Sequence, residues 1–144
     1  MFVLSTVFSA EAAVKISKKK VTVYTGSSIT LSVKGTNKTA KWSSSNKKVA
    51  KVSKKGKVTA VKKGTATITA KIGKKKYTCK VTVKNPSINK KKLTLEKDGT
   101  FTLKLTGTKI KSVKSSNKSV ATITKKGKVT AKSKGKCTIT LKGT

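Results

Sequence analysis

Side chains that commonly carry out catalysis or bind metals are scarce in this 144-residue chain. It has no histidine, and its only acids and thiols are Glu11, Glu96, Asp98, Cys79 and Cys137. General acid–base catalysis needs titratable groups held close together, and metal sites need clusters of His, Cys, Asp or Glu. Serines are frequent, but no histidine is present to activate one. The sequence therefore predicts that the protein is not an enzyme and holds no cofactor or metal.

Lysine is the only abundant charged residue type in the sequence. It supplies all 37 basic residues and gives a formal net charge of +34. A solvated lysine face keeps a protein soluble and blunts strand edges, but this does not explain why so few acids balance it. Such an imbalance drives binding to polyanions at low salt. We predict polyanion contacts at three runs of consecutive lysines: Lys18, Lys19 and Lys20; Lys74, Lys75 and Lys76; and Lys90, Lys91 and Lys92.

Residues 1–12 resemble the end of a secretory signal peptide. Residues 1–8 are uncharged and mostly apolar, and Ala10 and Ala12 are the small residues expected before a cleavage site. The basic start of such a peptide is missing, which suggests that the sequence is clipped. No apolar run approaches the roughly 18–20 residues of a membrane-spanning helix. We therefore expect an exported protein, extracellular or at the bacterial cell surface, that does not span the membrane.

The expected export of the protein and its use of lysine instead of arginine both bear on which polyanion it would bind. The chain has no arginine for bidentate reading of bases, and aromatic residues for base stacking are only 4% of the total. Specific nucleic-acid binding is therefore not expected. Anionic wall polymers such as teichoic acids, acidic glycans or lipid headgroups fit an exported chain better. Contact would be electrostatic, unspecific and sensitive to salt.

The lysines are carried by two copies of one unit, offset by about 71 residues. Both copies contain Lys-Lys-Gly-Lys-Val-Thr-Ala, at 54–60 and 125–131. The only proline, Pro86, lies between the copies, as expected of a linker. The predicted domains are a first module at 13–84, a linker at 85–87 and a second module at 88–144.

Within each copy, apolar residues alternate with Thr, Ser or Lys. This period of two predicts antiparallel strands with one apolar face and one solvated face, and Val and Thr favour strands. No segment has helical spacing. Several short strands in about 70 residues indicate a small β-sandwich, so the predicted fold is all-β with two tandem sandwiches. The expected core comprises Trp42, Val49, Val52, Val58, Ile68, Val81, Val120, Ile123, Val129 and Ile139.

Four blocks of the first copy also resemble a known family. Trp42-Ser-Ser-Ser-Asn46 precedes Val49-Ala-Lys-Val52, and the blocks at 56–60 and 64–70 read G-x-V-T-A and G-x-A-x-I-T-A. Together they are similar to the bacterial immunoglobulin-like domain, group 2. The resemblance covers nearly all of the chain after the leader. It implies immunoglobulin-like sandwiches of bacterial surface and secreted proteins, often arranged as tandem modules in adhesins or beside enzymatic domains.

The second copy departs from the first in two ways. Val113 stands where the first copy has Trp42, and the second copy stops at Thr144, where the first continues through 74–83. The second sandwich should therefore lack its last strand and leave the neighbouring strand unpaired. Either the sequence is a piece of a longer protein, or a strand from elsewhere completes the module. The clipped leader favours the first interpretation.

The two cysteines occupy different positions in their copies. Cys137 corresponds to Ala66, which we expect to face roughly toward Cys79 across the final hairpin. The resemblance implies that a complete module can join these two positions by a disulfide. A Cys79–Cys137 bond would need Cα atoms of separate domains within about 7 Å. We expect instead two buried thiols that pack as small apolar side chains.

These observations favour a non-enzymatic structural or adhesion module, acting as a spacer or binding stalk whose lysines contact anionic wall polymers or acidic glycans. Two alternatives remain. One is a secreted polycation that binds nucleic acid or membranes, and the other is an accessory fragment of a larger surface enzyme. The sequence does not indicate an oligomeric state.

Overall fold

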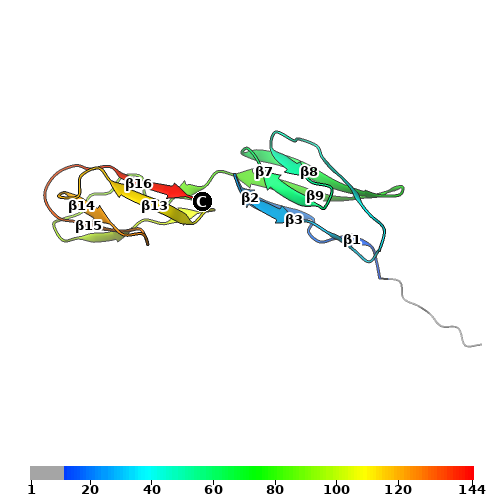
Figure 1. The fold of residues 1–144 in the computed structure, drawn as a ribbon, viewed down its shortest axis with the longest axis horizontal. Coiled ribbons are helices and arrows are strands. Elements are labelled where there is room, and N and C mark those ends of the chain that lie inside the picture. Colours follow the sequence, from blue (N-terminus) through cyan, green and yellow to red (C-terminus); the bar gives the residue numbers. More distant parts are fainter. Residues whose placement is uncertain (1–11) are drawn as a thin grey trace, which may run out of the picture. The chain divides into compact units, whose positions relative to one another are not determined.

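A computed structural model describes residues 12–144 (Figure 1). The expected signal peptide at 1–12, apart from Ala12, lies outside the described residues. The described chain divides into two compact units, one ending at Lys84 and one spanning Asn85–Thr144, called unit 1 and unit 2 below. Every regular element within 12–144 is a strand. This confirms the expected all-β class.

Unit 1 is built from two main sheets (Figure 1). One has the order β2-β9-β8-β5 and the other β3-β7-β6, while β1 and β4 form a small separate pair. All pairs are antiparallel except β2 with β9, which is parallel. The strands are β1 (Lys15–Ile16), β2 (Lys20–Tyr24), β3 (Ser28–Thr30), β4 (Val33–Lys34), β5 (Lys41–Ser44), β6 (Ala50–Val52), β7 (Lys57–Ala60), β8 (Gly64–Ile72) and β9 (Lys75–Lys84).

The core of unit 1 forms because alternate side chains of each strand point inward. Strand β8 buries Ala66, Ile68 and Ala70, and the facing positions of the other sheet include Val58, which is also fully buried. Trp42 is half-buried and packs against this cluster. Five of the ten residues expected in the core are buried, namely Val49, Val58, Ile68, Val81 and Val129. The other five are half-buried, namely Trp42, Val52, Val120, Ile123 and Ile139.

A serine hydroxyl links the two sheets in each unit. Ser44 on β5 donates a hydrogen bond to the carbonyl oxygen of Ala50 on β6 at 2.6 Å, and β5 and β6 belong to different sheets. Ser115 makes the same bond to Ala121 at 2.7 Å. The adjacent Asn46 accepts from the backbone N–H of Lys48 at 3.1 Å, as expected of a turn asparagine. Ser44, Ser115 and Asn46 therefore have structural roles.

Gly56 permits Leu31 and Trp42 to approach the β6–β7 turn closely. Its φ is +77°, in the left-handed region that favours glycine. A Cβ atom there would collide with the carbonyl oxygen of Leu31 and lie 2.9 Å from the Trp42 ring. Gly127 is placed in the same way in unit 2, where Ile110 lies against it at 3.2 Å from such a Cβ. Ile110 thus covers in unit 2 the glycine that Trp42 covers in unit 1.

Unit 2 repeats this plan with fewer paired strands (Figure 1). Its sheets are β13-β16, β11-β15-β14 and β10-β12, all antiparallel. Within residues 12–144 no strand follows β16, so the described part of unit 2 contains no counterpart of β9. The strands are β10 (Ser87–Ile88), β11 (Thr100–Thr102), β12 (Leu105–Thr106), β13 (Ile110–Ser115), β14 (Ala121–Ile123), β15 (Lys128–Ala131) and β16 (Ile139–Gly143).

A further difference between the described units concerns the segment of unit 2 that corresponds to β2. Residues 92–95, the counterpart of the start of β2, form no strand. In unit 1 every residue of β2 pairs with β9, so without a β9 counterpart this segment has no ladder to join. Leu93 is left 37% exposed. Ile139, the counterpart of the fully buried Ile68, is only half-buried.

The difference between the two cores predicts unequal costs for the same truncation. Ile68→Ala should destabilise unit 1 by about 3 kcal/mol, because it leaves a cavity between tightly packed sheets. Ile139→Ala should destabilise unit 2 by about 1 kcal/mol, because less apolar area is removed from a half-buried site. Urea unfolding followed by fluorescence of Trp42, the only tryptophan, reports on unit 1. It should shift for Ile68→Ala only, while circular dichroism follows both units.

Candidate polyanion interface

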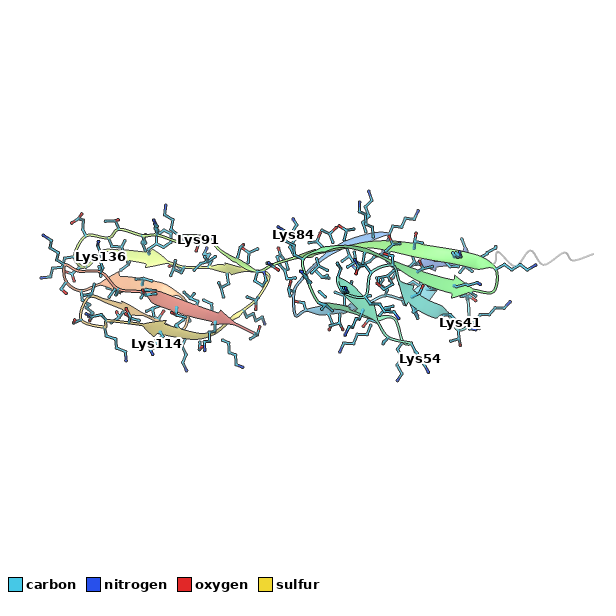
Figure 2. All side chains as sticks on the ribbon, turned by 90° about the horizontal axis from the view of Figure 1, so that it is seen from above. Lys41, Lys54, Lys84, Lys91, Lys114 and Lys136 are labelled. Atoms are coloured by element: carbon cyan, nitrogen blue, oxygen red, sulfur yellow. The ribbon has the colours of Figure 1, made fainter. Side chains whose placement is uncertain are left out.

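Every lysine of the chain lies in the described residues and is exposed. Unit 1 carries 21 of them and unit 2 carries 16. Figure 2 shows labelled examples, among them Lys41, Lys54 and Lys114, extending away from the strands. The described part of unit 1 contains no acid, whereas unit 2 contains Glu96 and Asp98. Unit 1 therefore has the less compensated surface.

The outer side of the sheet β2-β9-β8-β5 gathers lysines from all four strands. Strand β8 points alternate residues into the core, namely Ala66, Ile68 and Ala70. The residues that follow each of them therefore point outward, namely Thr67, Thr69 and Lys71. The same alternation holds on the other three strands. The result is a surface of lysine, threonine and serine, with Tyr24 opposite Lys84 at the end of β2. We call this surface the lysine face. Its lysines are Lys20, Lys41, Lys71, Lys76, Lys80 and Lys84.

Strand register places these lysines next to one another. Lys41 pairs with Lys71, and Lys71 pairs with Lys76, which makes a row across three strands. Lys20 pairs with Lys80 on β2 and β9. Directly paired residues have Cβ atoms about 4.5–5.5 Å apart, and like charges at that spacing destabilise a sheet. A bound polyanion would relieve this repulsion.

Threonines fill the space between the lysine rows. A shallow depression between β2 and β9 is lined by Lys20, Val21, Thr22, Lys80 and Thr82. Ammonium groups and hydroxyls side by side suit phosphate or carboxylate oxygens, because both can donate hydrogen bonds to them. The depression encloses no apolar pocket for a small molecule. The surface is therefore suited to a chain-like anion that lies along it.

Most residues of the three predicted lysine clusters lie outside the lysine face. Of these nine lysines, only Lys20 and Lys76 belong to it. Lys18 and Lys19 precede β2, and 74–75 lie at the β8–β9 hairpin. Lys90, Lys91 and Lys92 lie in the segment after β10 of unit 2 and are not part of this face. Sequence reasoning missed Lys41, Lys71, Lys80 and Lys84, because they are isolated along the chain and meet only through strand pairing.

Both units match one protein family. A model of the bacterial Ig-like domain (group 2) matches residues 11–81 and 82–142. The chain belongs to this family. Its two matched segments meet within three residues of the division between unit 1 and unit 2.

Several solved structures resemble this pair of Ig-like domains. Domains 4 and 5 of the S-layer protein SbsC are 26% identical, with a TM-score of 0.40, over 50% of this chain and 51% of that one. A structure of SbsC domains 1–6 is 23% identical, with a TM-score of 0.41, over 92% of this chain and 26% of that one. Human protocadherin-24 EC1-2 is 16% identical, with a TM-score of 0.40, over 85% and 78%.

The chain thus spans about half of the first of these S-layer chains and about a quarter of the second. Among curated protein sequences, none matches the chain.

Neither Ig-like domain offers the elements of a metal centre or a membrane span in its described residues. Within 12–144 no three His, Cys, Asp or Glu side chains come together. The same residues include no helix of the length and apolarity that crossing a bilayer requires.

The two cysteines are free thiols in different surroundings. Cys79 is buried in β9, and burial raises the pKa of its thiol, an effect that the charge of Lys18 partly opposes. Cys137 is half-buried, so the expectation of two buried thiols was right for Cys79 and wrong for Cys137. Register also corrects the expected facing pair, because Ala66 lies opposite Val81, while Cys79 lies opposite Ile68.

The lysine row of the first Ig-like domain predicts that salt stabilises unit 1. Lys71→Thr removes the central charge of the row and should stabilise unit 1 by about 0.5–1 kcal/mol at low ionic strength, with a smaller gain at 0.5 M salt. Lys51→Thr is the matched control, because Lys51 is an exposed strand lysine that pairs with Thr59. Urea unfolding monitored by Trp42 fluorescence would test this. An equal effect of both substitutions would contradict the role of the row.

Proposed function

We propose that this chain is part of an exported, non-enzymatic structural or adhesion protein of the bacterial surface. Its two Ig-like domains serve as a spacer or binding stalk. Membership of the bacterial Ig-like family supports the modular structural role. The near absence of acids, histidines and clustered metal-binding side chains supports a role without catalysis.

The lysine face supplies the binding mechanism. Paired lysines on a unit whose described residues include no acid place positive charges side by side on one sheet. Such a surface attracts a linear polyanion and releases that polymer's counterions on contact. Anionic wall polymers, teichoic acids or acidic glycans, have repeating charges that match a repeating row of amines. The single observation that carries the proposal is the row formed by Lys41, Lys71 and Lys76.

The same surface does not favour sequence-specific nucleic-acid binding. Reading bases in a duplex relies on bidentate side chains such as arginine, and the chain has none. Binding to single strands relies on exposed aromatic side chains for stacking. Trp42 is instead half-buried against the core. Any nucleic acid would therefore be held only through phosphates, as a competitor of the wall polymer.

Retention on purified cell wall across a salt series would test the proposal. A triple variant with Lys41, Lys71 and Lys76 changed to Thr should lower the slope of log retention against log salt by about 2–3, because three phosphate-like contacts are lost. Walls stripped of their anionic polymers by acid extraction should retain little of the unmodified protein. Co-sedimentation at several salt concentrations provides the measurement.

A second triple variant, with Lys51, Lys57 and Lys62 changed to Thr, serves as the control. It removes the same net charge from exposed positions outside the lysine face, so it should retain most of the slope. Retention that does not depend on salt would contradict electrostatic binding. Equal loss in both variants would contradict the lysine face while leaving binding by net charge in place.

A further inference from the structure

The outward residues of the sheet β2-β9-β8-β5 fall into rows of directly paired residues, and these rows alternate in chemistry. Rows that contain lysine, called amine rows below, are separated by rows of hydroxyls. In order from the β8–β9 hairpin the rows are Lys41, Lys71 and Lys76; Ser43, Thr69 and Thr78; Thr67, Lys80 and Lys20; Thr65, Thr82 and Thr22; and Lys84 with Tyr24.

Strand β9 contributes one residue to every row, namely Lys76, Thr78, Lys80, Thr82 and Lys84. Consecutive rows are two residues apart along β9, which is about 6.7 Å at the rise of a strand. Consecutive amine rows are therefore about 13 Å apart. Lys41 and Lys84 lie toward opposite ends of unit 1 (Figure 2). Because β9 is paired along both edges, this spacing is held by the sheet.

The row spacing can be compared with that of a linear polymer by counting backbone bonds. Two residues of a strand contain six backbone bonds, and an extended chain advances by roughly 1.1–1.2 Å per bond. One repeat of a poly(glycerol phosphate) also contains six, namely P–O, O–C, two C–C, C–O and O–P. Its phosphates therefore recur at about the spacing of the rows. A poly(ribitol phosphate) repeat has eight bonds, so its phosphates recur at about 9 Å and fall out of step with the rows.

We propose that the lysine face binds an extended poly(glycerol phosphate) that runs along β9 with one phosphate at each row. This assignment depends on the polyanion binding proposed above and names its ligand. At two amine rows a phosphate would lie between paired ammonium groups, those of Lys71 and Lys76 or those of Lys20 and Lys80. Both would donate charge-assisted hydrogen bonds to its free oxygens.

The hydroxyl rows would hold the intervening phosphates. A threonine hydroxyl donates one hydrogen bond and carries no charge, so it accepts a phosphate without adding to the repulsion between lysines. The shallow depression between β2 and β9 is lined by Lys20 and Lys80 of one row and by Thr22 and Thr82 of the next. It thus spans one step from an amine row to a hydroxyl row.

The described strands of unit 2 arrange their lysines differently. Lys142 of β16 pairs with Ser112, and Lys114 of β13 pairs with Thr140. Each lysine on these two strands thus lies opposite a hydroxyl, and β13 and β16 have no directly paired lysines. Sequence repetition alone therefore does not produce amine rows, and the site is assigned to unit 1.

Titration calorimetry with two purified polymers tests the spacing. Unsubstituted poly(glycerol phosphate) and poly(ribitol phosphate) with equal numbers of phosphates are titrated into the full chain at 0.15 M salt. The glycerol polymer should bind at least fivefold more tightly. A variant with Lys20→Thr and Lys80→Thr removes the paired lysines of the middle amine row, and its preference should fall below twofold.

A control variant separates spacing from charge density. Lys51→Thr with Lys57→Thr removes the same net charge from the other sheet and should keep the fivefold preference. The control is needed because the glycerol polymer also has more charge per length and would bind any polycation more tightly. An equal loss of preference in both variants would overturn the assignment.

Acetylation of lysines with and without the glycerol polymer tests its direction. Lys76, Lys80 and Lys84 should each be protected at least threefold more than Lys51 and Lys57, because the polymer covers the length of β9. Mass spectrometry measures the modification of each lysine. Protection confined to the row nearest the hairpin, without Lys84, would mean that the polymer lies across the strands and would contradict the proposed direction.

Two further outcomes separate this assignment from the proposed function. Equal affinity for both polymers would overturn the assignment, while salt-dependent retention on cell wall would still support the proposed function. Absence of salt-dependent binding to either polymer would count against both. Phosphatidylglycerol vesicles present glycerol phosphate without a linear repeat, so the two double variants should bind them equally. Weaker binding of the row variant would assign the rows to a lipid surface instead.

Discussion

Pairing of β9 on both of its edges is the constraint on which the rest of the structure depends. This ten-residue strand joins β2 to β8, and its inward residues Cys79, Val81 and Val83 are buried in the middle of the core. Unit 2 shows what happens where no such strand is described. The counterpart of β2 forms no strand, and the counterpart of Ile68 is half-buried. One strand thus determines both the hydrogen bonding of its neighbours and the completeness of the core.

The alternation that builds the core also builds the charged surface. In β8 and β9, residues of one parity fill the space between the sheets, and residues of the other parity are Thr or Lys in contact with water. Register then decides which lysines meet. Because Lys41, Lys71 and Lys76 share one row, the lysine face is a property of the paired sheet. No single strand carries it.

The sequence predicted the parts of the fold that depend on local pattern. Alternation in residues 64–70 and 77–83 was enough to predict strands β8 and β9. The candidate site was harder to predict, because consecutive lysines such as Lys90, Lys91 and Lys92 are conspicuous in a sequence. Lys41 and Lys71, thirty positions apart, become neighbours only through strand order. The sheet-linking hydroxyl of Ser44 was missed for the same reason.

The two units differ in the side chains that fill their cores and in the number of described acids. In unit 1, Trp42 lies opposite Ala70, whereas in unit 2 Val113 lies opposite Leu141, so a large–small pair is exchanged for two residues of medium size. This exchange partly preserves volume, and Ile110 takes over the place beside the turn glycine. The buried core cluster in the described residues of unit 2 comprises only Leu103, Ala121 and Val129. Both acids of residues 12–144, Glu96 and Asp98, also lie in unit 2, where they offset part of the charge of its lysines.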